Sequence, residues 1–344
     1  MSVVLNTLYV TQADAYLKLE RETLCVMVEG KKRLQIPLRH LGSLVLFDHV
    51  MVSPALMGRC MEDGRCIVWL DRSGGFKARV EGAVSGNVLL RQVQYRTMED
   101  SARCLELARR FIAGKLRNSR QILLRAARES TDGGEKAELV QTAQVIAHQI
   151  RKLPNAGDAD QVRGLEGDGA RRYFEQFSRL IKPKPRRHFS FDARNRRPPR
   201  DPVNALLSFL YALVLNDCRS ALETVGLDPQ AGFFHILRPG RPALALDLQE
   251  EFRAPLADRL ALTLINRGQI KPSHFEQFTN GAVLLNDEGR KLVITAYQKR
   301  KQETLIHPLL EQSVPVGLLC HIQARLLARY LRGDLDEYVP YLQR

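Results

Sequence analysis

The chain has 344 residues, of which 44% are apolar, and this composition excludes a disordered protein and allows two domains of ordinary size. Its formal net charge of +14 is unusual for an enzyme of small metabolites and typical of a protein that neutralises phosphates, although excess arginine can also simply solubilise a surface. Residues 1–90 hold 11 Lys and Arg against 9 Asp and Glu, whereas residues 91–344 hold 41 against 29. The second part therefore carries the positive charge.

The first 90 residues predict a small antiparallel β-domain. Short segments rich in β-branched and large apolar residues alternate with turn-forming residues. A helix is expected over 53–63, because Ser53 resembles an N-cap and Pro54 suits the first helical position. The expected strands are 5–10, 16–19, 24–28, 32–37, 44–47 and 66–70.

Residues 91–344 predict a larger all-α domain, so the fold class is α+β. Apolar residues recur there at intervals of three and four, which is the period of an amphipathic helix. The helix that begins at Asp201-Pro202 is apolar on every side through residue 215, which predicts a place in the middle of a bundle. Other helices are expected over 98–113, 116–127, 134–152, 250–266, 291–301 and 315–332.

A basic segment, residues 182–200, lies between the early and late helices. It holds eight Lys and Arg, one acid (Asp192) and four prolines, and the prolines predict that it is not helical. A plain linker and an arm that contacts DNA both remain open.

The six cysteines contain no Cys-x-x-Cys pair, which argues against a zinc site and for free thiols in a reducing compartment. The first residues lack a basic region followed by a long apolar run, so no secretory signal is expected. No stretch approaches the uninterrupted apolar length of a membrane span. We therefore expect a cytoplasmic protein with no membrane partner.

Four residues form the candidate metal site. Glu166 lies in a glycine-rich stretch expected to be a turn that opens a helix, His235 ends the run Gly232-Phe-Phe-His, and Asp247 and Glu250 stand at i and i+3, where a helix would aim both at one point. Carboxylates suit Mg²⁺, and Mn²⁺ also accepts a neutral imidazole. Each residue alone could be a cap or a hydrogen-bonded structural side chain. Together, in a basic chain, they favour metal-assisted chemistry on a polyanion.

The order of these motifs resembles that of the CRISPR-associated Cas-one proteins, the integrases of spacer acquisition. The resemblance covers Glu166-Gly, the run Asp201-Pro-Val-Asn through Tyr211, Gly232 to His235, and Asp247 to Arg253, and it looks closest to the type I-C forms. It implies a metal-dependent DNA endonuclease and integrase that dimerises largely through its β-domain and assembles with a small Cas-two partner. Such enzymes join the 3′-OH ends of short DNA duplexes into the CRISPR repeat array by transesterification.

The resemblance also implies roles for single residues. Glu166, His235 and Glu250 match the family's ligands for Mg²⁺ or Mn²⁺, and Asp247 matches an acidic position that either binds the ion or supports the site. Tyr211 matches a tyrosine near the site, where it contacts DNA or is a packed aromatic with a hydrogen-bonded hydroxyl. Basic side chains suited to hold DNA phosphates are Arg253, Arg259, Lys271, Lys299 and Arg300.

Two other functions fit the same residues. One is a stand-alone metal-dependent nuclease of branched DNA or RNA. The other is a non-catalytic DNA-binding scaffold in which the acids only pair with arginines. A metal requirement would separate enzyme from scaffold, and a requirement for a donor 3′-OH would separate integrase from nuclease.

Overall fold

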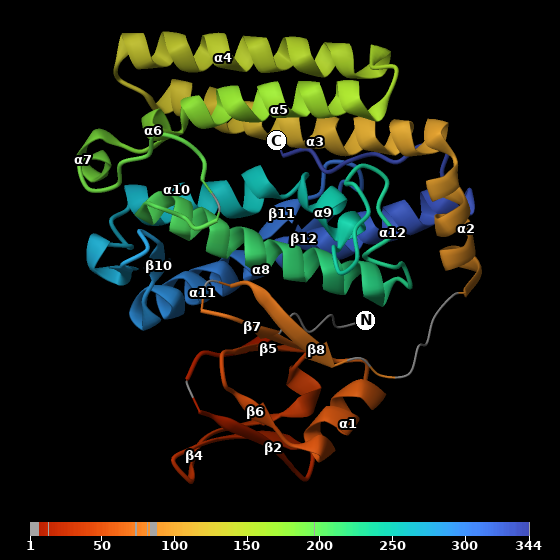
Figure 1. Cartoon of the computed structure of the whole chain (residues 1–344), viewed down its shortest axis with the longest axis vertical. Coiled ribbons are helices and arrows are strands. Elements are labelled where there is room, and N and C mark those ends of the chain that lie inside the picture. Colours follow the sequence, from red (N-terminus) through yellow and green to blue (C-terminus); the bar gives the residue numbers. More distant parts are fainter. Residues whose placement is uncertain are drawn as a thin grey trace.

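The computed structural model describes residues 7–12, 14–72, 74–80, 82, 88–195 and 197–343. Figure 1 shows a strand-rich part at one end of the molecule and a larger helical part at the other. This arrangement confirms the α+β class. Leu5 and Asn6 of the first expected strand, and Arg196 of the basic segment, lie outside the described residues.

The strand-rich part consists of two four-stranded sheets, in the orders β1-β5-β7-β8 and β4-β3-β2-β6. The expectation of an antiparallel domain holds for β2 with β3, β3 with β4 and β7 with β8, and is corrected elsewhere, because β1 pairs parallel to β5, β5 to β7, and β2 to β6. Strands that are joined by a crossover rather than a hairpin run in parallel, and helix α1 supplies the crossover between β5 and β7. The strands are β1 (Thr7–Val10), β2 (Tyr16–Glu20), β3 (Thr23–Val28), β4 (Lys31–Pro37), β5 (Ser43–Phe47), β6 (Met51–Val52), β7 (Cys66–Leu70) and β8 (Phe76–Val80).

Helix α1 (Pro54–Glu62) begins as the sequence predicts. The Ser53 hydroxyl accepts a hydrogen bond from the backbone N–H of Leu56, and Pro54 occupies the first helical position. Its buried residues Leu56 and Cys60 belong to a small core with both sheets. The other faces of β5 and β7 join the main core, so the strand-rich and helical parts are packed together.

The helical part contains more than helices. Two short hairpin pairs, β9 with β10 and β11 with β12, correct the expectation of an all-α domain. They are β9 (Phe275–Gln277), β10 (Val283–Leu285), β11 (Thr304–Ile306) and β12 (Ser313–Pro315). The helices are α2 (Val88–Glu99), α3 (Ser101–Glu129), α4 (Gly133–Lys152), α5 (Ala159–Glu175), α6 (Phe177–Leu180), α7 (Pro183–Arg186), α8 (Pro202–Thr224), α9 (Ala243–Gln249), α10 (Arg259–Asn266), α11 (Asp287–Gln302) and α12 (Leu319–Arg332).

Several helix boundaries differ from the prediction: α11 begins at Asp287 rather than 291, and α12 at Leu319 rather than 315, because Pro315 ends β12. The segments 98–113 and 116–127 belong mostly to one long helix, α3, whose N-cap Asp100 separates it from α2. Gly114 does not end this helix. It lets the C-terminal segment after α12 approach α3, because a Cβ on Gly114 would stand 2.9 Å from Pro340 Cβ. The predicted helix 250–266 is instead a turn, a π-helix (Arg253–Asp258) and then α10.

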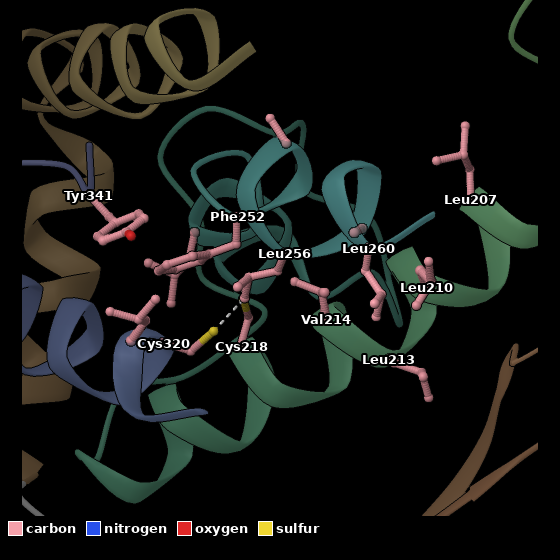
Figure 2. Packing of buried hydrophobic residues seen from close by; sticks show 14 of the residues in the cluster. Leu207, Leu210, Leu213, Val214, Cys218, Phe252, Leu256, Leu260, Cys320 and Tyr341 are labelled. Atoms are coloured by element: carbon pink, nitrogen blue, oxygen red, sulfur yellow. Dashed lines mark hydrogen bonds between the residues drawn. The ribbon is translucent and has the colours of Figure 1, made fainter. Parts of the chain in front are cut away.

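Helix α8 lies in the middle of the bundle, as its apolar surface predicts. It contacts α12, α9 and β10, and Cys218 on α8 has its Sγ 3.7 Å from Sγ of Cys320 on α12 (Figure 2). The statement that no stretch approaches a membrane span is corrected here. By length and composition alone α8 could cross a membrane, but a largely buried core helix passes the same test.

The basic segment 182–200 is partly folded against its neighbours. Contrary to the prediction, Pro183–Arg186 forms one helical turn, which proline permits in a first turn because those N–H groups need no partner. Arg186 pairs with Glu135 of α4 at 2.5 Å, and Arg194 donates to Asn204 Oδ1 of α8 at 2.6 Å. These contacts tie the segment to the helical part.

Candidate active site

Asp247, on α9, holds the loop that carries His235. Its two carboxylate oxygens accept the backbone N–H groups of Phe233, Phe234 and His235 at 2.7, 3.1 and 2.9 Å. Oδ1 also lies 2.6 Å from His235 Nδ1. Asp247 is fully buried, so its carboxylate fixes both the backbone and the ring of His235. The expectation that Asp247 and Glu250 aim at one point from one helix is corrected, because they reach opposite nitrogens of the imidazole.

The His235 loop lies close to α9 because Gly232 has no side chain. A Cβ on Gly232 would stand 2.7 Å from the carbonyl carbon of Ala243 and 2.8 Å from the nitrogen of Leu244, which only a shift of backbone could relieve. The carbonyl of Pro229 accepts hydrogen bonds from the N–H groups of Leu244 and Ala245 at the start of α9. The loop therefore caps the helix whose Asp247 in turn holds the loop.

Glu166, on α5, and Glu250, directly after α9, meet at the ammonium of Lys115, a residue of α3. Lys115 donates a hydrogen bond to Glu166 Oε1, and its Nζ lies 2.8 Å from Glu250 Oε2. Glu166 lies in the interior of α5, not in a turn that opens a helix as predicted, because its glycines are accommodated in the helix. One of them, Gly169, lets α5 approach α3: a Cβ there would stand 2.5 Å from Leu116 Cδ2.

Glu250 is surrounded by cations. It follows the last residue of α9, and its Oε1 lies 3.2 Å from Arg253 Nη1 and 3.7 Å from His235 Nε2. Burial raises the pKa of Glu250, but the charges of Arg253 and Lys115 outweigh burial and lower the pKa to about 2. Glu250 is therefore a carboxylate despite being only 3% exposed.

The adjacent Glu251 has the opposite environment. Burial raises the pKa of Glu251 to about 8, against hydrogen bonds from the Tyr338 hydroxyl, the Tyr341 N–H and the Gln323 amide. These partners belong to α12 and the C-terminal tail, so Glu251 anchors the tail rather than facing the ligand candidates. Two neighbouring carboxyl groups thus differ in charge because only one of them has cationic neighbours.

Tyr211 is a packed aromatic. Its hydroxyl donates to Asp258 Oδ1 at 2.7 Å, and the guanidinium groups of Arg194 and Arg253 lie over its ring at 5.3 and 5.2 Å. Tyr173 donates to the other oxygen of Asp258 at 3.0 Å. Tyr211 therefore has the contacts expected of a packed aromatic with a hydrogen-bonded hydroxyl. Its contact with DNA stays a prediction.

The predicted phosphate-binding residues differ in their surroundings. Arg253 pairs with Glu250, and Arg300 pairs with Glu303. Burial, together with the nearby charges of Arg125 and Arg300, lowers the pKa of Arg259, so these arginines form a basic neighbourhood. Lys271 and Lys299 are exposed. Binding of DNA by any of them stays a prediction.

Two carboxylates and one imidazole are ligand types that suit a divalent cation, and Lys115 stands between the two carboxylates. Among the residues that the structure describes, no three His, Cys, Asp or Glu side chains stand close enough to hold a metal together. Glu166 and Glu250 nevertheless face one cation, the Lys115 ammonium. The contact of Glu250 Oε2 with the Lys115 ammonium, at 2.8 Å, is an ion pair. A histidine whose second nitrogen is held by a carboxylate is the common form of a metal-ligating imidazole.

Lys115 and Asp258 are the residues that sequence reasoning missed. Lys115 lies among the buried apolar residues of α3, next to Leu116 and one turn after Phe111 and Ile112. A lysine on the apolar face of a helix requires a buried acidic partner, and that is a signal the sequence contains. Asp258 gives a similar signal, since it stands in the apolar run that continues into α10.

Comparison with known proteins assigns the chain to a family. Residues 8–299 match the family described as CRISPR associated protein Cas1, the Cas-one family named above. A curated relative from Moorella thermoacetica, named CRISPR-associated endonuclease Cas1 1, is 53% identical over 344 residues and covers all of both chains. The chain therefore belongs to the Cas1 family. The subtype is not decided by these matches.

Solved structures share the fold. The chain superimposes with a TM-score of 0.84 on part of a "Cas6-RT-Cas1--Cas2 complex", at 22% identity, covering all of this chain and 37% of that one. A structure titled "Casposase bound to integration product" matches with a TM-score of 0.82 at 20% identity, over 97% of this chain and 92% of that chain. At these identities the likeness is one of fold.

Proposed function

We propose that this Cas1-family chain is a metal-dependent DNA integrase and endonuclease of CRISPR adaptation. It joins the 3′-OH ends of short DNA duplexes into a CRISPR repeat by transesterification. The observation that carries the proposal is that Glu166 and Glu250 meet at the Lys115 ammonium, while Nε2 of the Asp247-held His235 lies 3.7 Å from the other oxygen of Glu250. The name of the Moorella relative, an endonuclease, and the integration product bound by the casposase support this class of reaction.

Glu166, Glu250 and Nε2 of His235 would hold the metal, Mg²⁺ or Mn²⁺. When bound, such an ion makes a hydroxyl a better nucleophile and neutralises charge on the phosphate under attack. Asp247 Oδ1 accepts a hydrogen bond from Nδ1–H of His235, so Nε2 carries the lone pair with which the ring would bind the metal. Because Asp247 is occupied by three backbone N–H groups and the ring, its role is to support the histidine.

The reaction requires no covalent intermediate on the protein. The donor 3′ oxygen forms a bond to the target phosphorus, the bond from that phosphorus to the target's own 3′ oxygen breaks, and a proton passes from the donor hydroxyl to the released oxygen. The chain's task is to position the DNA end and stabilise charge, and a bound 3′-OH has a large effective concentration. Basic side chains of the helical part would hold the phosphates.

The proposed assembly contains a homodimer formed through the strand-rich part and a small Cas-two-like partner, with a short duplex and the CRISPR repeat as DNA. The likeness of the fold to a chain of a complex that contains Cas2 supports the partner. The cytoplasm is the proposed location.

A donor duplex that ends in dideoxynucleotides tests the reaction. In the presence of Mn²⁺ we expect it to bind as well as the normal donor and to fail to join a repeat-containing target. The matched control is the same duplex with a free 3′-OH. Equal strand cleavage with both donors would favour the stand-alone nuclease, and DNA binding with no metal-dependent product would favour the scaffold.

A further inference from the structure

Lys115 holds together the two carboxylates that the proposed function assigns to the metal. Its ammonium contacts Glu166 of α5 and Glu250 beside α9, and its residue is only 8% exposed. Glu250 is buried and Glu166 half-buried, and two carboxylates near each other in such surroundings repel strongly unless a cation stands between them. Lys115 supplies that cation from a third helix, α3.

A divalent cation would use the same two carboxylates. Lys115 Nζ contacts one oxygen of each, Glu166 Oε1 and Glu250 Oε2, so a metal ion that bridges the two groups would lie close to the ammonium, and the two positive charges would repel each other. Lysine suits an exchange of this kind, because its charge sits at the end of a flexible four-carbon stem, whereas the guanidinium of arginine binds carboxylates in a fixed fork.

We propose that Lys115 is a resident counter-ion that competes with the catalytic metal: it holds Glu166 and Glu250 together in the metal-free protein and moves away from them when the divalent ion binds. Lys115 thereby lowers the affinity for metal while keeping the two carboxylates in place. It is a positioning residue, and the proposal rests on the proposed function, since that function names the ligands.

Binding of Mn²⁺ to the full chain, measured by isothermal titration calorimetry without DNA, tests the proposal. Lys115→Met keeps the length of the side chain and removes the charge, so we expect at least tenfold tighter binding. Lys115→Arg keeps the charge in a planar guanidinium that can bind carboxylates through two hydrogen bonds, so we expect Mn²⁺ to bind at least threefold more weakly. The arginine variant keeps the test valid if the methionine variant does not fold.

Lys301→Met is the matched control. Lys301 is also buried, at 7% exposed, and its Nζ lies 2.9 Å from Asp217 Oδ2, at a pair that involves none of the proposed ligands. Its substitution should leave the affinity for Mn²⁺ unchanged although it too removes a buried ion pair.

The outcomes separate this inference from the proposed function. If the wild-type chain binds Mn²⁺ and Lys115→Met binds it equally or more weakly, or Lys115→Arg binds it more tightly, the inference is wrong and the metal site stands. If neither the wild type nor the folded variants bind Mn²⁺, the proposed metal site itself is wrong.

Discussion

Asp247 shows how much of this site depends on one side chain that need not touch a metal. Its carboxylate accepts four contacts from the segment Phe233 to His235, three from backbone N–H groups and one from the ring. An amide at this position would present one oxygen where two are needed and would leave a buried N–H without a partner. The His235 ring would then lose its fixed orientation.

We therefore expect Asp247→Asn to lower the affinity for Mn²⁺ and the rate of DNA joining about 10- to 100-fold, the usual effect of losing a partner behind a metal-binding histidine. The control is Asp217→Asn, which loses a carboxylate that accepts from Tyr297 and Lys301 elsewhere in the core. Equal losses in both variants would show that the effect is one of stability alone.

The sequence singled out residues that the structure brings near one another, but not how they are arranged. Glu166, His235, Asp247 and Glu250 could be picked out by residue type, order and resemblance, whereas Lys115 could not be assigned to Glu166 and Glu250. The pairing of Lys115 depends on how α3, α5 and α9 pack, because its partner Glu166 is 51 positions away in the sequence. Nor does spacing tell which of two nearby acids supports a histidine and which faces a cation.

The π-helix Arg253–Asp258 is the element that places the residues around Tyr211. Single turns of this wider helix are rare and often occur at functional sites, and here the turn carries Arg253 at one end and Asp258 at the other. Asp258 accepts hydrogen bonds from Tyr173 on α5 and Tyr211 on α8. One carboxyl group thus fastens three helical elements together.

Burial raises the pKa of Asp258 to about 6, despite the two tyrosine hydrogen bonds and the charges of Arg194 and Arg253. The folded protein therefore holds this proton more tightly than the unfolded chain. The contribution to stability is fully present below about pH 3.8 and is lost as the pH rises through about 6. At neutral pH the loss amounts to about 3 kcal/mol, from about 1.4 kcal/mol for each pKa unit.

Asp258→Asn removes this titration. The free energy of unfolding of the wild type minus that of the variant should therefore decrease as the pH rises from 4 to 7. Urea unfolding at several pH values measures the difference. The control is Asp48→Asn, whose carboxyl lies on the strand-rich part beside Arg72. A constant difference between wild type and Asp258→Asn across this range would contradict the raised pKa.

Elements with strong local signals were predicted well, and those set by distant partners were not. The cap of α1 and the apolar run of α8 are local features. Strand direction depends on which strands pair, and β1 pairs with β5 although the strands β2 to β4 lie between them in sequence. The turn after α9 likewise follows from the contacts of Glu250 and Glu251, and the periodicity of 250–266 does not reveal it.

At the scale of the whole molecule, the excess charge predicts binding of DNA that weakens steeply with salt. Each neutralised phosphate releases counterions, so a plot of log affinity against log salt concentration has a slope of about −0.9 for each phosphate contact. We expect Lys271→Ala and Lys299→Ala each to make this slope shallower by about 1. Lys31→Ala, at an exposed lysine of β4, is the control and should leave it unchanged. Equal effects of all three substitutions would mean that the charge acts without a defined surface.

The sheet β4-β3-β2-β6 lies farthest from the helical part in Figure 1, and several of its large apolar side chains are exposed. Tyr16 of β2 and Met51 of β6 are register partners, 38% and 58% exposed, and Leu34 of β4 is 41% exposed. If the proposed homodimer forms here, Met51→Glu should convert it to monomer in sedimentation velocity. Ile306→Glu, at an equally exposed apolar residue of the helical part, should not. A Met51→Glu protein that remains a dimer would place the interface elsewhere.

The burial of α8 has a consequence for how the chain is made. The cover of this helix includes α12, and the contact between Cys218 and Cys320 joins residues 102 positions apart. A ribosome therefore releases a helix apolar enough for a bilayer well before it synthesises the segment that will shield it. We expect nascent chains stalled before Leu319 to float with lipid vesicles or to bind chaperones, and full-length chains to do neither. Until α12 arrives, lipid and protein compete for the same helix.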